Sequence, residues 1–491
     1  MSLQVGKDKV GAIGAGFGIM TVVGGLAFSE LASAYLQSTY GPLLNLLGVR
    51  LGADAAQLNW ISAAYLLSSV VCVPVLAKLG DLYGHKRMVV ITLVIVIVGT
   101  VLAAFATTFP LFLSGMLVQG AVSALLPLEM AIVRERAGDQ ASKGIGLLVG
   151  CLGGGAVVGI LLTGLLGTVL DLTLVMLVPA ALLVLSLLII ILTVPETQIR
   201  SEGRIDWKGA SLLGIGLALV LYAISNGKTL GWLSPAILGM IVVGLALLFL
   251  FVRVEKTVRH PLIDIKLVTR GGVGFYLILM LLFGIQQLGS GPVNSLYVAS
   301  KPGKVGYGFG LDSLGVSLTL VPYALMLMIG AVVGHALVRR MGQMQTLIWA
   351  NVLVIAKYAM LIVFSRDLAI FTAAQFVGGL GVGIFIAVLP AIIVGLAPKD
   401  ASGIAGAMYN TTRTLAGAVG GAVFAAIMSS MFLPAAKVPS LDAFLVIWAI
   451  CGGLSVVIMA FLPFSRHLGR VRTTMSDETL QDQDLGLVSQ D

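Results

Sequence analysis

The chain has 491 residues, of which 58% are hydrophobic and 11% are charged, and its formal net charge is +8. A soluble protein of this length needs more charge to cover its surface, so a soluble class is excluded. Crossing a bilayer takes roughly 20 apolar residues, and such segments recur along nearly the whole sequence. An all-α integral membrane protein with 14 spans is predicted. The predicted spans are 12–36, 57–79, 88–107, 110–133, 144–168, 172–193, 207–224, 234–252, 273–297, 313–337, 344–364, 367–396, 403–432 and 441–463.

Lysine and arginine are distributed unevenly between the alternating loops. If the N-terminus, which holds Lys7 and Lys9, is placed in the cytoplasm, 22 of the 30 basic residues fall on the cytoplasmic side and six on the other. Cytoplasmic loops of membrane proteins carry this excess. A multi-pass protein of the plasma (inner) membrane with both termini in the cytoplasm is therefore predicted. Since the basic residues are spread over every inner loop, binding to nucleic acid is not expected.

Several kinds of chemistry have no support in the sequence. The four histidines have no metal-ligand spacing, no nucleophile is placed beside a base, and no GxxxxGK[ST] motif is present. We therefore expect neither an enzyme nor a metal or cofactor. The glycines in "GCLGGGAVVG", residues 150–159, lack a full GxGxxG and suit the close packing of helices in lipid.

The stretch "AKLGDLYGHKRM", residues 77–88, concentrates charge between the second and third predicted spans. Gly84 permits a tight turn. Asp81 can cap a helix N-terminus on the facing side, and Lys86 and Arg87 can pair across the interface between two halves. Such a cluster would latch the cytoplasmic side shut. The alternative is a solvated loop whose positive charge only sets the orientation.

This stretch resembles the signature G-x-L-x-D-R-x-G-R-K/R of the major facilitator transporters. Ala77 stands in place of the first Gly, and Leu82 in place of the first Arg. An internal echo follows between the tenth and eleventh spans, where "HALVRRMGQ" supplies Arg339, Arg340 and Gly342 to the predicted latch. Gly342 falls where Gly84 falls, as expected for two parallel repeats.

The resemblance extends to the 14-helix drug:proton antiporters. Residues 59–67 ("NWISAAYLL"), 204–214 ("RIDWKGASLLG"), 254–268 ("VEKTVRHPLIDIKLV") and 408–420 ("MYNTTRTLAGAVG") are similar to segments of that family in the same order. The family layout implies two pseudo-symmetric six-helix bundles joined by two linking helices. The expected divisions are 1–196 for the first bundle, 197–270 for the linking helices and an inner loop, 271–465 for the second bundle and 466–491 for a disordered cytoplasmic tail.

The sequence also departs from the family's coupling motifs. The R-x-x-Q-G of helix 4 has Met116 in place of its Arg, and the G-P-x-x-G-G of helix 5 has Ala156 in place of its Pro. The helix-1 motif L-D-x-T has Glu30 as its nearest acidic residue. These departures leave open a transporter without the family's usual proton coupling.

Four ionisable residues lie well inside predicted spans, where a charge is costly and function is the first hypothesis. Glu30 and Glu129 are the predicted proton carriers. Glu30 would load from outside, while Glu129 would release to the cytoplasm or hold a cationic substrate. Arg413 would replace the missing helix-4 Arg, or else hold a network between helices. Lys357 is expected at the lipid-facing edge, where its long side chain can reach the interface.

Polar and aromatic side chains suggest the wall of a binding cavity that is otherwise apolar. Such a wall suits hydrophobic or amphipathic substrates held by few polar contacts. The alternative for the amides is hydrogen bonding between helices. The predicted substrate-binding residues are Tyr65, Gln119, Phe283, Gln286, Gln287, Asn294, Gln375, Phe376 and Asn410.

The sequence favours a monomeric secondary active transporter of the multidrug efflux type. It would export hydrophobic or amphipathic small molecules by alternating access, with proton entry as the driving force. Its expected partners are lipophilic small molecules or lipids, protons and membrane lipids. Two alternatives stay open: a transporter or flippase for a lipid or an endogenous metabolite without that coupling, and a non-transporting membrane sensor or scaffold.

Overall fold

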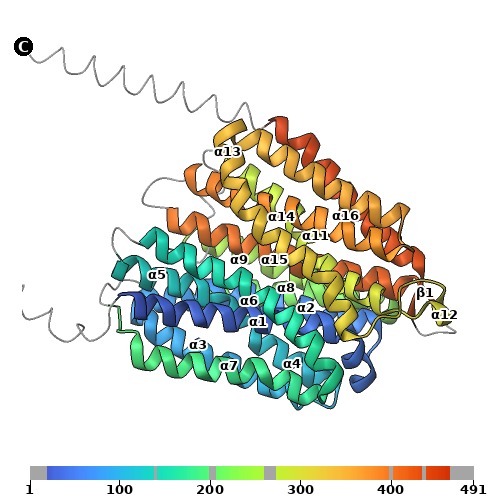
Figure 1. The fold of residues 1–491 in the computed structure, drawn as a ribbon, viewed down its shortest axis with the longest axis horizontal. Coiled ribbons are helices and arrows are strands. Elements are labelled where there is room, and N and C mark those ends of the chain that lie inside the picture. Colours follow the sequence, from blue (N-terminus) through green and yellow to red (C-terminus); the bar gives the residue numbers. More distant parts are fainter. Residues whose placement is uncertain are drawn as a thin grey trace, which may run out of the picture.

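The computed structural model describes residues 19–137, 141–197, 206–258, 272–396, 402–433 and 438–464. Long helices run side by side along the length of the molecule (Figure 1). The predicted tail 466–491, together with Lys7 and Lys9, lies outside the described residues. The elements are α1 (Ile19–Leu51), α2 (Ala55–Tyr83), α3 (His85–Ala104), α4 (Phe109–Gln119), η1 (Gly120–Ala124), α5 (Leu125–Ala137), α6 (Ala141–Val169), α7 (Leu172–Thr193), α8 (Trp207–Leu230), α9 (Pro235–Glu255), α11 (Val273–Ala299), α12 (Pro302–Val305), α13 (Ser313–Val363), α14 (Leu368–Leu396), α15 (Ser402–Ser430), β1 (Phe432–Leu433), β2 (Val438–Pro439), α16 (Leu441–Phe461) and η4 (Leu462–Phe464).

The predicted class, an all-α membrane protein, is confirmed. Among the described residues, 12 helices are long and apolar enough to cross a membrane. One of them, α13, has 51 residues and covers two predicted spans, 313–337 and 344–364, with a break in helical geometry at Gly342. The first helix runs from Ile19 to Leu51, well beyond the predicted span 12–36. The count of 14 spans stays a prediction.

Two glycines with positive φ mark equivalent turns. Gly84 separates α2 from α3 with φ of 106°, and Gly342 divides α13 with φ of 81°. Residues with a Cβ rarely adopt this conformation, whereas Gly adopts it readily. The echo seen in the sequence therefore has a counterpart in the backbone.

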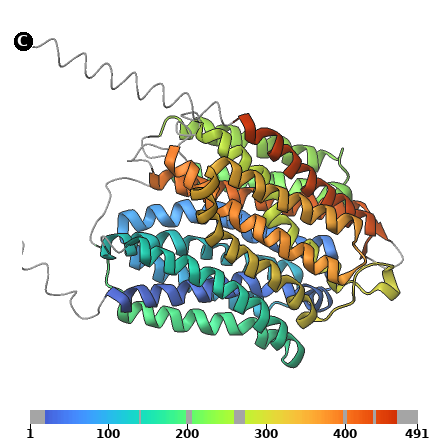
Figure 2. The ribbon, with the colours of Figure 1, turned by 45° about the horizontal axis from the view of Figure 1, so that its top comes forward.

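The helices fall into groups that pack mainly among themselves. Helices α1 to α7, here the N-terminal half, pack through pairs such as α1 with α6 and α3 with α7. Helices α11 to α16, here the C-terminal half, pack through pairs such as α13 with α14 and α11 with α15. Figures 1 and 2 place α7 on the opposite side of the molecule from α16. The linking helices α8 and α9 pack on each other, and α8 also contacts α2 and α15.

The two halves contact each other toward one end of the molecule. We call the end with α12 and the β1–β2 strands the hairpin end, and the end with Gly84 and Gly342 the basic end. Near the hairpin end, α6 meets α13: Ser317 Oγ donates to the Ile160 carbonyl at 2.7 Å, and a side chain on Gly164 would overlap Ser317. A Cβ on Gly146 or Gly150, nearer the basic end of α6, would meet nothing within 4 Å. Along this pair the halves are therefore closed at the hairpin end and apart at the basic end.

A second junction between the halves, α2 with α15, is also closed toward the hairpin end. Asn59 Nδ2 donates to the Gly421 carbonyl at 2.5 Å. Gly421 lies against Ala63, and Gly417 lies against Leu66. Glycine lets the two helix backbones approach closely, which is a common way to pack helices in lipid.

An aromatic cluster fixes the hairpin end of the C-terminal half. Tyr297 stacks on Tyr307 and Phe371, with ring centroids 5.6 Å and 5.7 Å away, and its hydroxyl donates to the Ser365 carbonyl at 2.8 Å. The Tyr307 hydroxyl donates to the Pro439 carbonyl at 2.6 Å. Burial raises the pKa of Tyr307 to about 12, so the hydroxyl keeps its proton near neutral pH. The cluster ties the loop before α13 to the strands before α16.

Candidate functional site

Two buried carboxyl groups face each other inside the N-terminal half. Glu30 on α1 is 1% exposed and Glu129 on α5 is 0% exposed, and their side chains interact electrostatically. Ser33 Oγ donates to Glu30 Oε2 at 3.3 Å. Glu30 Oε1 and both Glu129 carboxyl oxygens have no hydrogen-bond partner within the described part of the chain, and no basic side chain pairs with either there. The two carboxyl groups thus form a buried polar site whose negative charge no described cation neutralises.

The facing carboxyl groups do not fit the expectation that Glu30 loads protons and Glu129 releases them at separate sites. The sequence placed Glu30 near the outside and Glu129 near the cytoplasm, as separate loading and release sites. In the structure the packing of α1 on α5 brings both side chains to one place. Any proton they hold therefore belongs to the pair.

Tyr65 on α2 is hydrogen-bonded to polar groups of the N-terminal half. Its hydroxyl is 3.0 Å from Ser123 Oγ, which in turn is 2.9 Å from Ser69 Oγ. The same hydroxyl is within electrostatic reach of both Glu30 and Arg413. The Tyr65 hydroxyl on α2 is therefore within electrostatic range of ionisable groups in both halves.

Arg413 is an intramembrane cation of the C-terminal half. It lies near the middle of α15, is partly exposed, and donates through Nε to Gln287 Oε1 on α11 at 3.1 Å. The rings of Tyr323 on α13 and Tyr409 on α15 are also within its electrostatic reach. No carboxylate of the described residues pairs with it. The described hydrogen bond of the guanidinium is therefore to a neutral amide and uses its Nε–H, so its other N–H groups can bind a ligand.

Lys357 does not face lipid, so the predicted position at the lipid-facing edge is wrong. It is 3% exposed, and its Nζ lies 4.7 Å from the ring centroid of Tyr323 and 5.1 Å from that of Tyr358. Its aliphatic part lies against Gly378 of α14, where any Cβ would overlap it. Because Gly378 has no side chain, Lys357 can reach inward past α14.

Three of the predicted binding amides are engaged in hydrogen bonds between helices. Gln119 and Tyr40 are bonded, with Tyr40 Oη 2.8 Å from Gln119 Oε1. Gln286 Oε1 accepts from Ser455 Oγ at 2.9 Å. Asn294 Oδ1 accepts from Trp448 Nε1 at 3.0 Å. These contacts fasten α4 to α1 and α11 to α16, which is the alternative use of such amides.

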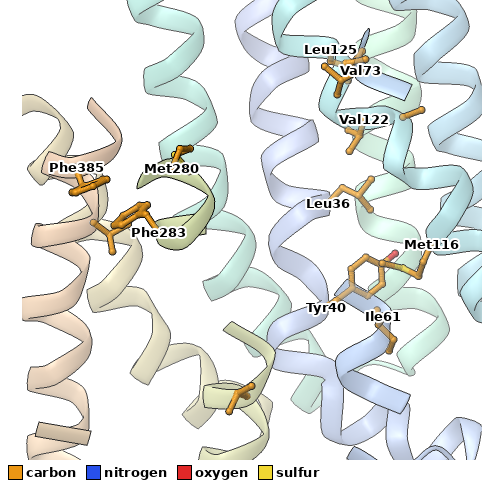
Figure 3. Packing of buried hydrophobic residues seen from close by; sticks show 14 of the residues in the cluster. Leu36, Tyr40, Ile61, Val73, Met116, Val122, Leu125, Met280, Phe283 and Phe385 are labelled. Carbon is orange, nitrogen blue, oxygen red and sulfur yellow. The ribbon is translucent and has the colours of Figure 1, made fainter. Parts of the chain in front are cut away.

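The remaining predicted binding residues lie in different surroundings. Phe283 stacks on Phe385 inside the C-terminal half, with centroids 4.0 Å apart (Figure 3). Gln375 is buried, and its Nε2 has no partner within the described ranges. Phe376, next to it, is 50% exposed. The Asn410 side chain is partly exposed one turn before Arg413 on α15. Of the nine predicted residues, Gln287 is hydrogen-bonded to Arg413, and the Tyr65 hydroxyl is within electrostatic reach of it.

The predicted latch residues bond within their own half or are exposed. Asp81 Oδ1 pairs with His85 Nε2 at 3.2 Å, four residues along the chain. Lys86 Nζ donates to the Ile191 carbonyl on α7 at 3.0 Å. The other predicted cations, Arg87, Arg339 and Arg340, are exposed. With the basic ends of the halves apart, no bond of this cluster crosses between them among the described residues, and its role as a latch stays a prediction.

Glu196, just after α7, is a residue that the sequence reasoning missed. Its Oε1 accepts from the backbone N–H of Lys86, and its Oε2 accepts from that of Arg87, both at 3.0 Å. Thr197 Oγ1 accepts from the backbone N–H of His85 at 2.9 Å. A Cβ on Gly84 would overlap the Glu196 carboxylate. A carboxylate thus caps the N-terminus of α3, where the helix dipole favours negative charge. The position of Glu196, an acidic residue shortly after the apolar span 172–193, was the sequence signal that could have indicated a helix cap.

This arrangement of membrane-spanning helices in two halves around a polar centre defines a multi-pass membrane transporter. The family model of the Major Facilitator Superfamily matches residues 26–421, and the chain belongs to that superfamily.

Known relatives are similar to this chain at low identity. A uridine/deoxyuridine transporter of Lactococcus lactis subsp. cremoris (strain MG1363) is 27% identical over 367 residues, which are 70% of this chain and 73% of the relative. Multidrug resistance protein 3 of Bacillus subtilis (strain 168) is 23% identical over 421 residues, which are 85% of this chain and 80% of the relative. A crystal structure of the nucleoside transporter NupG aligns with a TM-score of 0.63 at 16% identity, over 90% of this chain and 98% of that one. This structure supports the fold alone.

Proposed function

We propose that this chain is a secondary active transporter that exports hydrophobic or amphipathic small molecules by alternating access, coupled to proton entry. The observation that carries the proposal is the buried Glu30–Glu129 carboxyl pair, with which no basic side chain of the described residues pairs. The Tyr65 hydroxyl is within electrostatic reach of Glu30 and of Arg413 in the other half. Similarity to multidrug resistance protein 3 supports the export of drug-like compounds.

The carboxyl pair suits proton coupling because its charge depends on its surroundings. Two facing carboxylates without a cation repel each other strongly in a medium of low polarity, so the buried pair favours at least one bound proton. When the halves rearrange, Arg413 or water can approach the pair and stabilise the ionised form. A proton taken up in one state is then released in the other.

The contacts between the halves fit one state of alternating access. With the basic end in the cytoplasm, as the Lys and Arg distribution predicts, the α6–α13 and α2–α15 junctions close the extracellular side. The polar centre then faces the cytoplasm, from which an exporter takes its substrate. We propose that the protein acts as a monomer in the plasma membrane, with both termini in the cytoplasm. Its bundles are 1–196 and 271–465.

Proton entry supplies enough free energy for export. One proton crossing about 100 mV gives about 2.3 kcal/mol, and one pH unit adds about 1.4 kcal/mol. Together they support a gradient of roughly a few hundredfold for a neutral substrate.

A second candidate function is the transport of a lipid or an endogenous metabolite without this coupling. Met116 and Ala156 stand where the family's coupling motifs have Arg and Pro. Similarity to the uridine/deoxyuridine transporter favours a metabolite as substrate. Selective transport of one metabolite, unaffected by a pH gradient, would establish this second function.

The decisive test is transport by the purified protein in liposomes with an imposed pH gradient and a panel of dyes, drugs, nucleosides and lipids. The double variant Glu30→Gln/Glu129→Gln is the matched control. We expect the native protein to accumulate lipophilic compounds against their gradient and the double variant to equilibrate them only. Accumulation by the double variant, driven by pH alone, would overturn the assignment of the proton site.

A further inference from the structure

Ionisable groups near the middle of the described helices are divided by sign between the halves. The N-terminal half holds Glu30 and Glu129, whereas the C-terminal half holds Lys357 and Arg413. Acidic residues in the described C-terminal helices lie at helix ends, as Asp442 does at the start of α16. Within the described helices of the C-terminal half, the interior therefore has a positive charge that no acidic residue there balances.

Both cations interact with Tyr323 of α13. Lys357 Nζ lies 4.7 Å from the centre of the ring, and Arg413 is within electrostatic reach of the hydroxyl. Gln287 binds Arg413 through its Oε1 and interacts with Tyr323 as well. The four side chains come from α11, α13 and α15, so the packing of the half creates this site.

If Lys357 and Arg413 had only a structural role, the cost of burying their positive charges would not be offset. Cations over aromatic rings gain a modest attraction, which is smaller than the cost of burying a charge without a counterion. Lys357 is 3% exposed and no carboxylate of the described residues pairs with either cation. An anion bound beside them would offset that cost.

Two buried amide donors of the C-terminal half are unsatisfied among the described residues. Gln375 Nε2 and Gln286 Nε2 are buried and have no hydrogen-bond partner in the described part of the protein. Gln375 lies three residues before Gly378, against which Lys357 packs, so both share one face of α14. Buried donors are ordinarily satisfied, and an acceptor-rich ligand would satisfy them.

We propose that Arg413 and Lys357 form an anion-binding site around Tyr323, and that the transported substrate is a lipophilic molecule with an acidic group. This inference rests on the proposed transport function and names its substrate class. Arg413 is partly exposed, so it contacts the acid directly, and Gln287 orients the guanidinium. Lys357 is behind the Tyr323 ring and adds positive potential.

Matched acid and amide probes test the charge requirement in the purified full chain in detergent, without any proton gradient. The probes are radiolabelled 1-naphthylacetate and dodecanoate, each with its primary amide, measured by scintillation proximity at pH 7.5. We expect each acid to bind about tenfold more tightly than its amide. Arg413→Gln should abolish this preference, Arg413→Lys should restore part of it, and Lys357→Met should reduce it about threefold.

Two further variants separate a binding effect from misfolding. Gly378→Ala keeps both charges but displaces Lys357, so it should lower the preference in the same direction as Lys357→Met. Lys304→Gln removes an exposed cation at the hairpin end and should leave the preference unchanged. Equal binding of acid and amide, failure of both acids to bind, or an unchanged preference in a folded Arg413→Gln protein would each overturn the proposal. Since no gradient is used, these results do not depend on proton coupling.

Discussion

Glu30 on α1 and Glu129 on α5 place their carboxyl groups face to face, 1% and 0% exposed, and no basic side chain in the described part of the chain pairs with them. The two residues are about a hundred positions apart in the chain, and only the packing of α1 on α5 joins them. Side chains that act as one unit give strongly non-additive effects when they are changed separately.

The first prediction follows from this pairing. Glu30→Gln and Glu129→Gln should each abolish accumulation driven by a pH gradient while leaving downhill exchange intact, and the double variant should be no worse than either single one. Accumulation and exchange of one fluorescent substrate in liposomes give both quantities. Independent, multiplicative losses would show that the carboxyl groups act as two separate sites.

The second prediction concerns Asp81. Asp81→Asn removes the negative charge that pairs with His85 and that the predicted latch needs to close the basic end. A latch residue biases the conformational equilibrium and does not contact the cargo. We expect turnover to fall about tenfold with substrate affinity changed less than about twofold. Asp442→Asn, an exposed acid at the hairpin end, is the control. Equal losses of affinity and turnover would contradict the latch role.

The third prediction tests the cap on α3. Glu196→Ala removes an acceptor from the backbone N–H groups of Lys86 and Arg87. The loss of such a cap costs about 1–2 kcal/mol, and the midpoint of thermal unfolding should fall. Asp171→Asn is a suitable control, because Asp171 starts α7 without a side-chain cap bond. Equal stability of both variants would show that the Glu196 cap is dispensable.

The fourth prediction uses the close approach of the two halves. Gly164→Val would overlap Ser317 and force α6 away from α13 at the hairpin end, whereas Gly150→Val meets open space. Spin labels at Val49 and Leu318, both exposed near the hairpin end, report the separation. We expect a longer mean distance in Gly164→Val and no change in Gly150→Val. Identical distances in the two variants would show that this junction does not hold the hairpin end closed.

The fifth prediction concerns the aromatic cluster. Tyr297→Ala leaves a large cavity among stacked rings and should cost about 3–5 kcal/mol, whereas Tyr307→Phe loses one hydrogen bond worth about 1 kcal/mol. Thermal unfolding in detergent should rank the two variants in that order. The control is Tyr222→Ala, since Tyr222 is 46% exposed on α8. A drop in stability with Tyr222→Ala as large as with Tyr297→Ala would remove the special role of the cluster.

Sequence reasoning placed the helices well because the length of an apolar run is a local property. The predicted spans 57–79, 172–193 and 273–297 lie inside or coincide with α2, α7 and α11. The turn at Gly84 and its echo at Gly342 were likewise predictable, since positive φ selects glycine locally.

Side-chain direction was less predictable than helix position. These helices are apolar on all sides, so no amphipathic stripe tells which face meets a neighbour. Phe283 and Phe376 had equal standing as cavity residues, yet one is fully buried and the other is half exposed.

The sequence by itself determined that this protein is a helical membrane transporter of the major facilitator type, and which few charges lie within its spans. Only the tertiary structure decided which of those charges meet. It paired Glu30 with Glu129, set Arg413 on Gln287, and turned Lys357 inward past Gly378. The reason is physical. The length of an apolar span is encoded along the chain. Contact between side chains depends on the rotation of each helix about its axis and on glycines, such as Gly378, in helices far away in sequence.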